Sequence, residues 1–261
     1  MVIGGLGGIG AATAAELARA GVKVALVGRS EERLEGVASR LRAAGGECLT
    51  NAADLSEESE CLRVFQRVQE AFGPADILVN SAGLRWYGFG TEMPWNLARE
   101  MIQVNIAAVV RLSLLFLRDM KARNSVHVIN VGSVIGALLT QGAALYSATK
   151  SFLDSLTSAL HRELRGTQVH VSVVRPGPVA TAFFEKTSAQ PAALPLPGKR
   201  FAVAPEAVAR RIMRVIRRPT RVAYVPRLLS IAPWLEPSLG WLIDLLGPVL
   251  LKWQTKRLSG S

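Results

Sequence analysis

Tyr146 and Lys150 are the residues whose types and spacing most directly suggest proton-transfer chemistry. They lie in the stretch Ala-Leu-Tyr-Ser-Ala-Thr-Lys of residues 144–150, and residues four apart on a helix share one face. An ammonium close to a phenol favours the phenolate, so it lowers the tyrosine pKa from its reference of about 10. We therefore expect Tyr146 to donate or accept a proton near neutral pH.

Ser133 is the third residue that could take part in this chemistry. It follows the apolar run Val126–Val131, which predicts a buried strand. The end of a strand and the next helix can bring Ser133 beside Tyr146. A Tyr-x-x-x-Lys spacing also arises by chance in long helices, so it gains weight only from other motifs.

Glycines at the start of the chain form such a motif, because they precede the helical run 11–18. Glycines let the backbone approach a phosphate, and a helix N-terminus supplies free N–H groups and the positive end of a dipole. Gly5, Gly7 and Gly10 fit the spacing G-x-G-x-x-G, which alone is a weak signal. Gly4 and Gly8, again with Gly10, fit G-x-x-x-G-x-G, and the residues downstream favour this second spacing. A flexible turn without a ligand is the alternative.

Several further short motifs follow in a fixed order along the chain. The full set comprises Gly4, Gly8 and Gly10, then Asp54-Leu55, Asn80-Ser81-Ala82-Gly83, Asn105, Ser133, Tyr146 with Lys150, and Pro176-Gly177 followed by Thr181. Over about residues 1–225 the chain therefore resembles the short-chain dehydrogenases/reductases. The resemblance implies a Rossmann-like fold, a nicotinamide dinucleotide cofactor and the interconversion of carbonyl and alcohol groups.

Three features depart from the pattern of that family. Ile3 stands where a threonine usually precedes the first glycine, and Ser81 replaces the usual second asparagine. Only Met1, Val2 and Ile3 precede the turn, where a full first strand is expected. Either the start is truncated or the central strand is very short, which bears on stability more than on chemistry.

The resemblance implies four catalytic residues. Tyr146 would transfer the proton, and Ser133 would bond the substrate carbonyl oxygen, where charge develops as hydride arrives. Lys150 would bond the nicotinamide ribose while lowering the pKa of Tyr146. Asn105 resembles the asparagine of the family that holds a water in a proton relay to the lysine. The alternative for Asn105 is a polar residue that bends its helix.

Cofactor contacts are expected along the carboxyl ends of the strands, where such folds bind dinucleotides. The glycine turn would hold the pyrophosphate, and the resemblance places Asp54 against the adenine. The alternative for Asp54 is an acid at a helix N-terminus near Ser56. The expected contacts are Gly4, Gly5, Leu6, Gly8, Ile9, Gly10, Arg29, Ser30, Asp54, Leu55, Asn80, Ala82, Gly83, Tyr146, Lys150, Pro176, Gly177, Val179 and Thr181.

The tip of the second strand predicts a preference for NADP(H) over NAD(H). NAD-selective folds place an acid there to bond the ribose 2′-hydroxyl. Here the strand Val22–Val27 runs into Gly-Arg-Ser, and Arg29 can pair with a 2′-phosphate. Glu31 and Glu32 come later and are typical of the first turn of a helix capped by Ser30. A surface arginine at a helix boundary is the alternative.

Length and hydrophobic periodicity predict one α/β domain. The chain has 261 residues, 49% of them hydrophobic, which suffices for a single large core. Apolar runs at 22–28, 77–80, 126–131 and 169–175 alternate with amphipathic stretches, which predicts a doubly wound parallel sheet between two helical layers. We expect a Rossmann-type catalytic domain over residues 1–227 with a shortened first strand, a lid at about 182–200, and an apolar C-terminal extension over 228–261.

Other classes of site are not supported by the sequence. The two cysteines, Cys48 and Cys61, form neither a disulfide framework nor a metal spacing, which fits a reduced cytoplasmic setting. The three histidines are scattered, so no metal is expected. The start lacks the pattern of a signal peptide. The segment around Ser133 is not the G-x-S-x-G of serine hydrolases.

The net charge of +11 is concentrated in one region. Nine basic residues and one acid lie between Lys199 and Arg227, which gives +8, and residues 228–261 carry +1. Residues 1–198 therefore carry only +2, and a nucleic-acid partner is not expected. The apolar segment Leu228–Leu251 follows, and its acids and prolines argue against a transmembrane span. We expect it to pack or to form the contact of a homodimer or homotetramer. Peripheral membrane contact beside the arginines is the alternative.

The substrate is expected to be a small lipophilic carbonyl compound or alcohol. Phe183, Phe184, Leu194 and Leu196 in the lid, and Leu84, Trp86, Tyr87 and Phe89 after Gly83, would line its site. Packing of these side chains under the loops is the alternative. For the whole protein, the alternative is an NADP(H)-binding regulatory or membrane-surface interaction protein of the same fold.

Overall fold

The computed structural model describes residues 2–4, 7–123, 126–138, 141–181, 202–235, 237–238, 240–242 and 244–247. The expected contacts Gly5 and Leu6 and the lid expected at 182–200 lie outside these residues.

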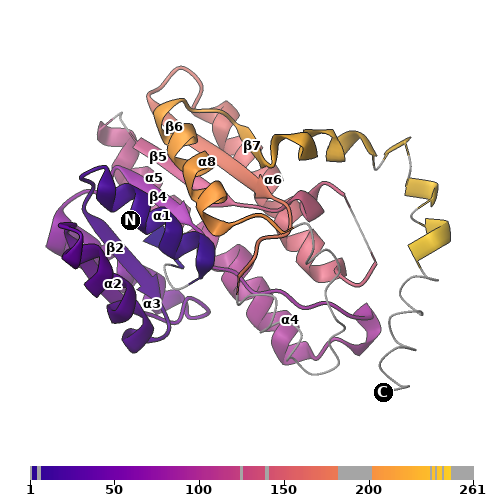
Figure 1. The fold of residues 1–261 in the computed structure, drawn as a ribbon, viewed down its shortest axis with the longest axis horizontal. Coiled ribbons are helices and arrows are strands. Elements are labelled where there is room, and N and C mark those ends of the chain that lie inside the picture. The colour runs from indigo at the N-terminus through magenta and orange to yellow at the C-terminus, as the bar shows by residue number, and fades with distance from the viewer. Residues whose placement is uncertain are drawn as a thin grey trace.

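A seven-stranded parallel sheet forms the centre of the protein, in the order β3-β2-β1-β4-β5-β6-β7 (Figure 1). The strands are β1 (Val2–Ile3), β2 (Val24–Gly28), β3 (Cys48–Ala52), β4 (Ile77–Asn80), β5 (Val126–Val131), β6 (Val169–Pro176) and β7 (Val222–Val225). The chain winds outward from β1 in both directions, so the predicted doubly wound α/β fold is confirmed.

Helices cover both faces of this sheet because alternate residues of each strand point to opposite faces. Val24 and Leu26 of β2 pack under α1 (Gly8–Arg19), α2 (Glu31–Ala43) and α8 (Pro205–Arg217). Ala25 and Val27 pack with the other face, under α3 (Glu58–Phe72) and α5 (Ala108–Arg123). The long α6 (Ala144–Glu163) runs behind the sheet in Figure 1.

The central strand β1 has two residues, as the sequence indicates. Val2 pairs with Leu26 of β2 and with Val79 of β4, so β1 is hydrogen-bonded on both sides despite its length. β7 was not anticipated by the sequence analysis. It pairs with β6, and its residues Ala223 and Val225 are buried.

The most apolar helical stretch, Trp95–Asp119, has the length and hydropathy of a membrane span. It contains α4 (Trp95–Ile102), a π-helical turn at Gln103–Ala107 and most of α5. Half of its most apolar window is buried in the protein, and Leu112 and Phe116 of α5 lie in the core. The apolar composition therefore serves packing against the sheet.

The three histidines lie in the sheet or pack against it. His127 of β5 is buried, and its Nε2 lies 2.8 Å from Ser172 Oγ. Burial, with His170 and His161 nearby, lowers the pKa of His127 to about 4, so it is a neutral core residue near pH 7. In the described part of the chain no three histidine, cysteine or acidic side chains gather as metal ligands.

Candidate active site

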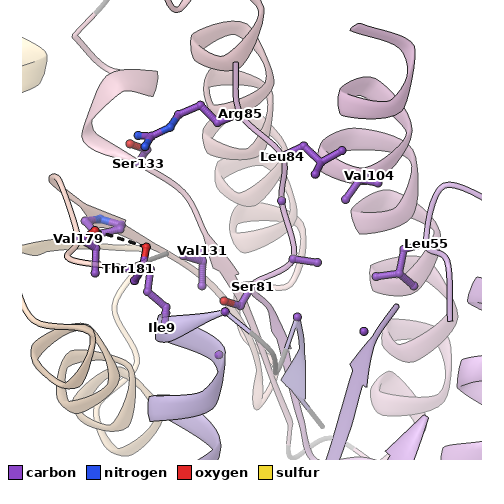
Figure 2. A pocket seen from close by; sticks show the side chains of 18 of the residues that line it. Ile9, Leu55, Ser81, Leu84, Arg85, Val104, Val131, Ser133, Val179 and Thr181 are labelled. Atoms are coloured by element: carbon purple, nitrogen blue, oxygen red, sulfur yellow. Dashed lines mark hydrogen bonds between the residues drawn. The ribbon is translucent and has the colours of Figure 1, made fainter. Parts of the chain in front are cut away.

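A pocket of about 520 Å³ lies at the carboxyl ends of the strands. Parallel sheets bind ligands where the strand order reverses, which here is between β1 and β4. The volume lies within the range of about 300–1,000 Å³ that is usual for ligand pockets. Residues that follow β1, β2, β3, β4, β5 and β6 all contribute to its wall, as Figure 2 shows in part.

The glycine turn forms the floor of this pocket, and two of its glycines have no space for a side chain. Gly4 has a φ of +84°, and a Cβ there would lie 2.7 Å from Ala82 Cα. A Cβ on Gly8 would collide with Thr181, and would lie 3.1 Å from Pro205 Cγ. Gly7 has ordinary space around it, so the geometry favours the spacing of Gly4, Gly8 and Gly10. The N-terminus of α1 opens here, with Gly8, Ile9 and Gly10 on the pocket wall.

Residues after β2 and β3 line one end of the pocket. Arg29 lies there with a side chain 57% exposed, and its Nη1 is 2.7 Å from Glu100 Oε1. Ser30 caps α2 by accepting from Arg33 N, and both residues line the pocket. Arg29 and Arg33 bring positive charge to this end of the pocket, and Asp54 and Glu100 bring negative charge beside them.

Asp54 takes the structural role that was its alternative, and its contact with an adenine stays a prediction. The carboxylate lines the pocket beside Leu55, and its Oδ1 accepts from Ser56 N at 3.0 Å and from Ser56 Oγ at 2.8 Å. The bond from the Ser56 backbone lowers the pKa of Asp54. Helix α3 begins at Glu58, so Asp54 holds the turn that precedes the helix.

Ser133, Tyr146 and Lys150 come together at the opposite end of the pocket. Ser133 lies just beyond β5, where its Oγ accepts from Ile135 N at 3.4 Å. Tyr146 and Lys150 lie on one face of α6, and the Tyr146 phenol forms a hydrogen bond with Ser133. Both α6 side chains are buried, at 7% and 5% exposure, yet both reach the pocket wall.

The expected effect of Lys150 on Tyr146 is not found, and this prediction is corrected. Burial raises the pKa of Tyr146, while the charge of Arg85 and the bond with Ser133 act in the opposite direction. Lys150 Nζ donates to Val131 O at 3.0 Å and lies 5.7 Å from the centroid of the Tyr146 ring. Its ammonium is directed to a backbone carbonyl, and the Tyr146 side chain is largely buried, so desolvation has the larger effect on the Tyr146 pKa.

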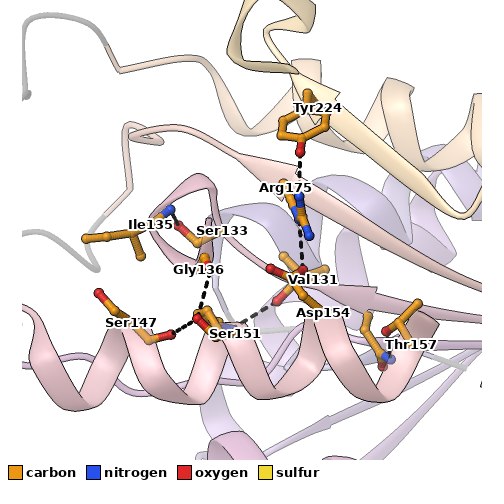
Figure 3. Close-up of polar contacts among 12 residues, drawn as sticks. Val131, Ser133, Ile135, Gly136, Ser147, Ser151, Asp154, Thr157, Arg175 and Tyr224 are labelled. Carbon is orange, nitrogen blue, oxygen red and sulfur yellow. Dashed lines mark hydrogen bonds and ion pairs between the residues drawn. The ribbon is translucent and has the colours of Figure 1, made fainter. Parts of the chain in front are cut away.

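Burial also lowers the pKa of Lys150 to about 8. Asp154, one turn further along α6, raises that pKa, whereas Arg85 lowers it. Arg175 Nε in turn donates to Asp154 Oδ1 at 2.9 Å, and Arg175 also bonds the Tyr224 hydroxyl (Figure 3). This buried group lies behind the pocket, because neither Asp154 nor Arg175 lines it.

Two predicted site residues lie behind the pocket wall. Asn105 is fully buried in the π-helical turn, where its Oδ1 accepts from Leu84 N and its Nδ2 donates to Leu84 O and Thr149 Oγ1. These bonds hold the pocket wall at Leu84 against α6. The expected role of Asn105 in a water relay to Lys150 stays a prediction. The expected lining role of Asn80 is wrong for its side chain, which is buried under α5 and donates to Ser113 of that helix and to Asn130 of β5.

The remaining predicted contacts that are described line the pocket. They are Ala82 and Gly83 after β4, and Pro176, Gly177, Val179 and Thr181 after β6. Sequence reasoning missed several lining residues, among them Arg33, Ser81, Arg85 and Gly132. Ser81, Arg85 and Gly132 lie in the segments after β4 and β5, so their place after predicted strands is the signal that could have found them. Arg33 lies in the first turn of α2.

Comparisons with known proteins agree with this geometry. The family model described as short chain dehydrogenase matches residues 1–192. An uncharacterized oxidoreductase of Staphylococcus saprophyticus is 38% identical over 182 residues, which cover 69% of this chain and 78% of that protein.

Solved structures give the same result. A short-chain dehydrogenase of Sphingobium yanoikuyae in complex with NADPH is 25% identical, with a TM-score of 0.80 over 93% of this chain and 94% of its own. A short chain dehydrogenase/reductase of Burkholderia phymatum in complex with NAD is 26% identical, with a TM-score of 0.80 over 88% of this chain and 90% of its own.

Proposed function

Because the chain belongs to the short-chain dehydrogenase/reductase family, we propose that it is an NADP(H)-dependent oxidoreductase that interconverts a ketone or aldehyde and an alcohol. The carrying observation is that Ser133, Tyr146 and Lys150 line the same end of one pocket, whose wall also includes the glycine turn. A bound nicotinamide supplies or accepts the hydride. The residues of the chain then have only to bind, orient and move one proton.

Each of the three side chains has a distinct task. Ser133 donates to the carbonyl oxygen and stabilises the charge that develops there. Tyr146 gives its phenolic proton to that oxygen in the reductive direction and removes it in the oxidative direction. Lys150 bonds the ribose of the nicotinamide half. Its lowered pKa of about 8 lets it return a proton to the phenolate near neutral pH.

The glycine turn fits the pyrophosphate. Side chains at Gly4 and Gly8 would fill the space along the α1 N-terminus, whose free N–H groups suit an anion. Asp54, Leu55 and Ala82 would hold the adenosine half, and Val179 and Thr181 would close over the nicotinamide amide.

A preference for NADP(H) is supported by the cations beyond β2. Replacing Arg29 with alanine is expected to lower kcat/KM for NADPH by about 10- to 100-fold, since a charge-assisted bond contributes about 1.5–3 kcal/mol. The value for NADH should change little. Steady-state kinetics with both cofactors measure this, with Arg118→Gln on the outer surface of α5 as the control. Equal efficiency of the two cofactors in the wild type would exclude the preference.

An apolar substrate is supported by the walls near Tyr146. Leu84 lines the main pocket, and Trp86 lines a second pocket of about 310 Å³ that shares Tyr146 with it. Tyr87 is buried in a hydrophobic cluster with Ala143, so its ring belongs to the packing beneath the loop. The aromatic residues of the expected lid lie outside the described residues.

Ketones of increasing chain length test the reaction and the apolar site together. NADPH consumption is expected, with kcat/KM rising as the apolar part of the ketone grows, because each buried methylene contributes about 0.8 kcal/mol. Absence of turnover across ketones, aldehydes and secondary alcohols would overturn the proposed reaction. Turnover that is independent of chain length would overturn the apolar site only.

The C-terminal residues support an enclosing and assembling role. Leu229 packs against Gly177 at the pocket, and Gly247 against Gln141 in the loop before α6. Exposed apolar side chains lie along the same segment: Leu228, Ile231, Trp234, Trp241, Leu245 and Leu246. We assign this surface to a homodimer or homotetramer contact, and peripheral membrane contact through the same residues is the alternative.

A further inference from the structure

Arg85 lies at the reacting end of the pocket and has no role in the reaction described above. It follows Leu84 in the segment after β4 and lines the pocket. Its guanidinium points toward Ser133, as Figure 2 shows, and its Cζ lies 5.6 Å from the centroid of the Tyr146 ring. A substrate carbonyl held by Ser133 and Tyr146 would therefore lie beside this cation.

Arg85 is partly buried beside the pocket. Its exposure is intermediate, and burial lowers the pKa of its guanidinium, while the nearby Tyr146 acts in the opposite direction. A guanidinium in such a place attracts a carboxylate more strongly than one in open water does, because water screens the two charges less.

The balance of charge in the pocket favours an anion at this end. Arg85 and Lys150 both lie there, and Arg85 lowers the pKa of Lys150. Asp154 compensates Lys150 from behind the wall and is itself paired with Arg175. Among the described lining residues the single carboxylate is Asp54, which lies after β3 at the other end and accepts from Ser56.

We propose that Arg85 binds the carboxylate of an oxo acid substrate, so that the enzyme reduces apolar 2- or 3-oxo acids or oxidises the matching hydroxy acids. The planar fork of a guanidinium matches a carboxylate with two parallel bonds. Because Arg85 lies near Ser133 and Tyr146, the carboxylate and the carbonyl of the substrate would lie close together, as they do in 2- and 3-oxo acids. The proposal rests on the function proposed above and adds one charged anchor to its apolar site.

A matched pair of substrates tests the anchor. The wild type is expected to reduce 3-oxo-octanoate with higher kcat/KM than methyl 3-oxo-octanoate. Arg85→Gln should lower kcat/KM for the acid by about 10- to 100-fold, the usual loss of a charged hydrogen bond, and leave the ester within a few-fold. Arg85→Lys should retain part of the preference for the acid. The control Arg118→Gln removes an exposed charge of α5 and should affect neither substrate.

A purely electrostatic or structural role of Arg85 gives a different result. If Arg85 acted only by favouring the Tyr146 phenolate, Arg85→Gln would lower kcat equally for acid and ester and shift both pH profiles to higher pH. If it acted only in packing, the melting temperature and both activities would fall together. An equal loss of activity on the acid and on the ester, or a wild type that prefers the ester, would show that Arg85 does not bind the substrate carboxylate.

A measurement of substrate binding tests the contact between Arg85 and the carboxylate separately from the proposed reaction. With NADPH bound to Tyr146→Phe, which keeps the ring beneath Arg85, the quenching of NADPH fluorescence gives a Kd for acid and ester without turnover. The acid should bind more tightly, and Arg85→Gln in this background should remove the difference. If the wild type turns over neither substrate but this difference persists, the reaction is wrong and the anchor stands. Equal Kd values for the two compounds overturn the anchor directly.

Discussion

The Tyr146→Phe variant is expected to lose about 10²- to 10⁴-fold in kcat, the range that a positioned proton donor usually contributes. The variant removes one hydroxyl, which bonds Ser133 and would meet the substrate oxygen. The ring stays in its buried cluster with Trp86 and Met101, so the fold and this part of the pocket wall are unaffected. Steady-state kinetics and a fluorescence titration with NADPH measure the two effects separately, and the Kd for NADPH should change little.

Tyr224→Phe is the matched control for this loss. It removes a phenol that bonds Arg175 outside the pocket, so kcat should stay within a few-fold of the wild type. A Tyr146→Phe variant that keeps a large part of wild-type kcat would show that another group delivers the proton. A parallel loss of NADPH affinity would instead assign Tyr146 a binding role.

Gly4→Ala is expected to abolish cofactor binding and to lower the free energy of unfolding by about 2–5 kcal/mol. Two costs combine: an L-residue held at positive φ, and overlap of its Cβ with backbone atoms of Ala82. The backbone at Ala82 cannot move away to relieve this overlap, because Ala82 follows β4, which pairs directly with β1. Urea unfolding and NADPH titration measure the two effects.

Gly36→Ala serves as the control for the glycine substitution. Gly36 is an exposed residue within α2, and a Cβ there meets nothing within 4 Å. Alanine should stabilise the helix by about 0.5–1 kcal/mol and leave NADPH binding unchanged. If Gly4→Ala bound NADPH with the wild-type Kd, the glycine turn would not be the pyrophosphate site.

The sequence by itself determined the fold class and most of the pocket wall. Short apolar runs between amphipathic stretches predicted the parallel sheet, and β4 and β5 have the predicted bounds. Many of the lining residues that follow strand ends were found because all parallel strands end at one edge. The pair Tyr146 and Lys150 was found because helical spacing is a local property.

Tertiary structure alone decided which way each side chain points and what burial does to its charge. Asn80 ends β4 as predicted, but its amide donates to Ser113 of α5 and Asn130 of β5, away from the pocket. Tyr146 lies four residues from Lys150, and this spacing predicted a lowered pKa for the phenol. The pKa is instead raised, because segments that are distant in the chain bury the phenol. Arg85 carries no motif, and only the packing of its loop against α6 brings its charge to the Tyr146 ring. Spacing along the chain fixes local geometry, whereas desolvation depends on every element that surrounds a group.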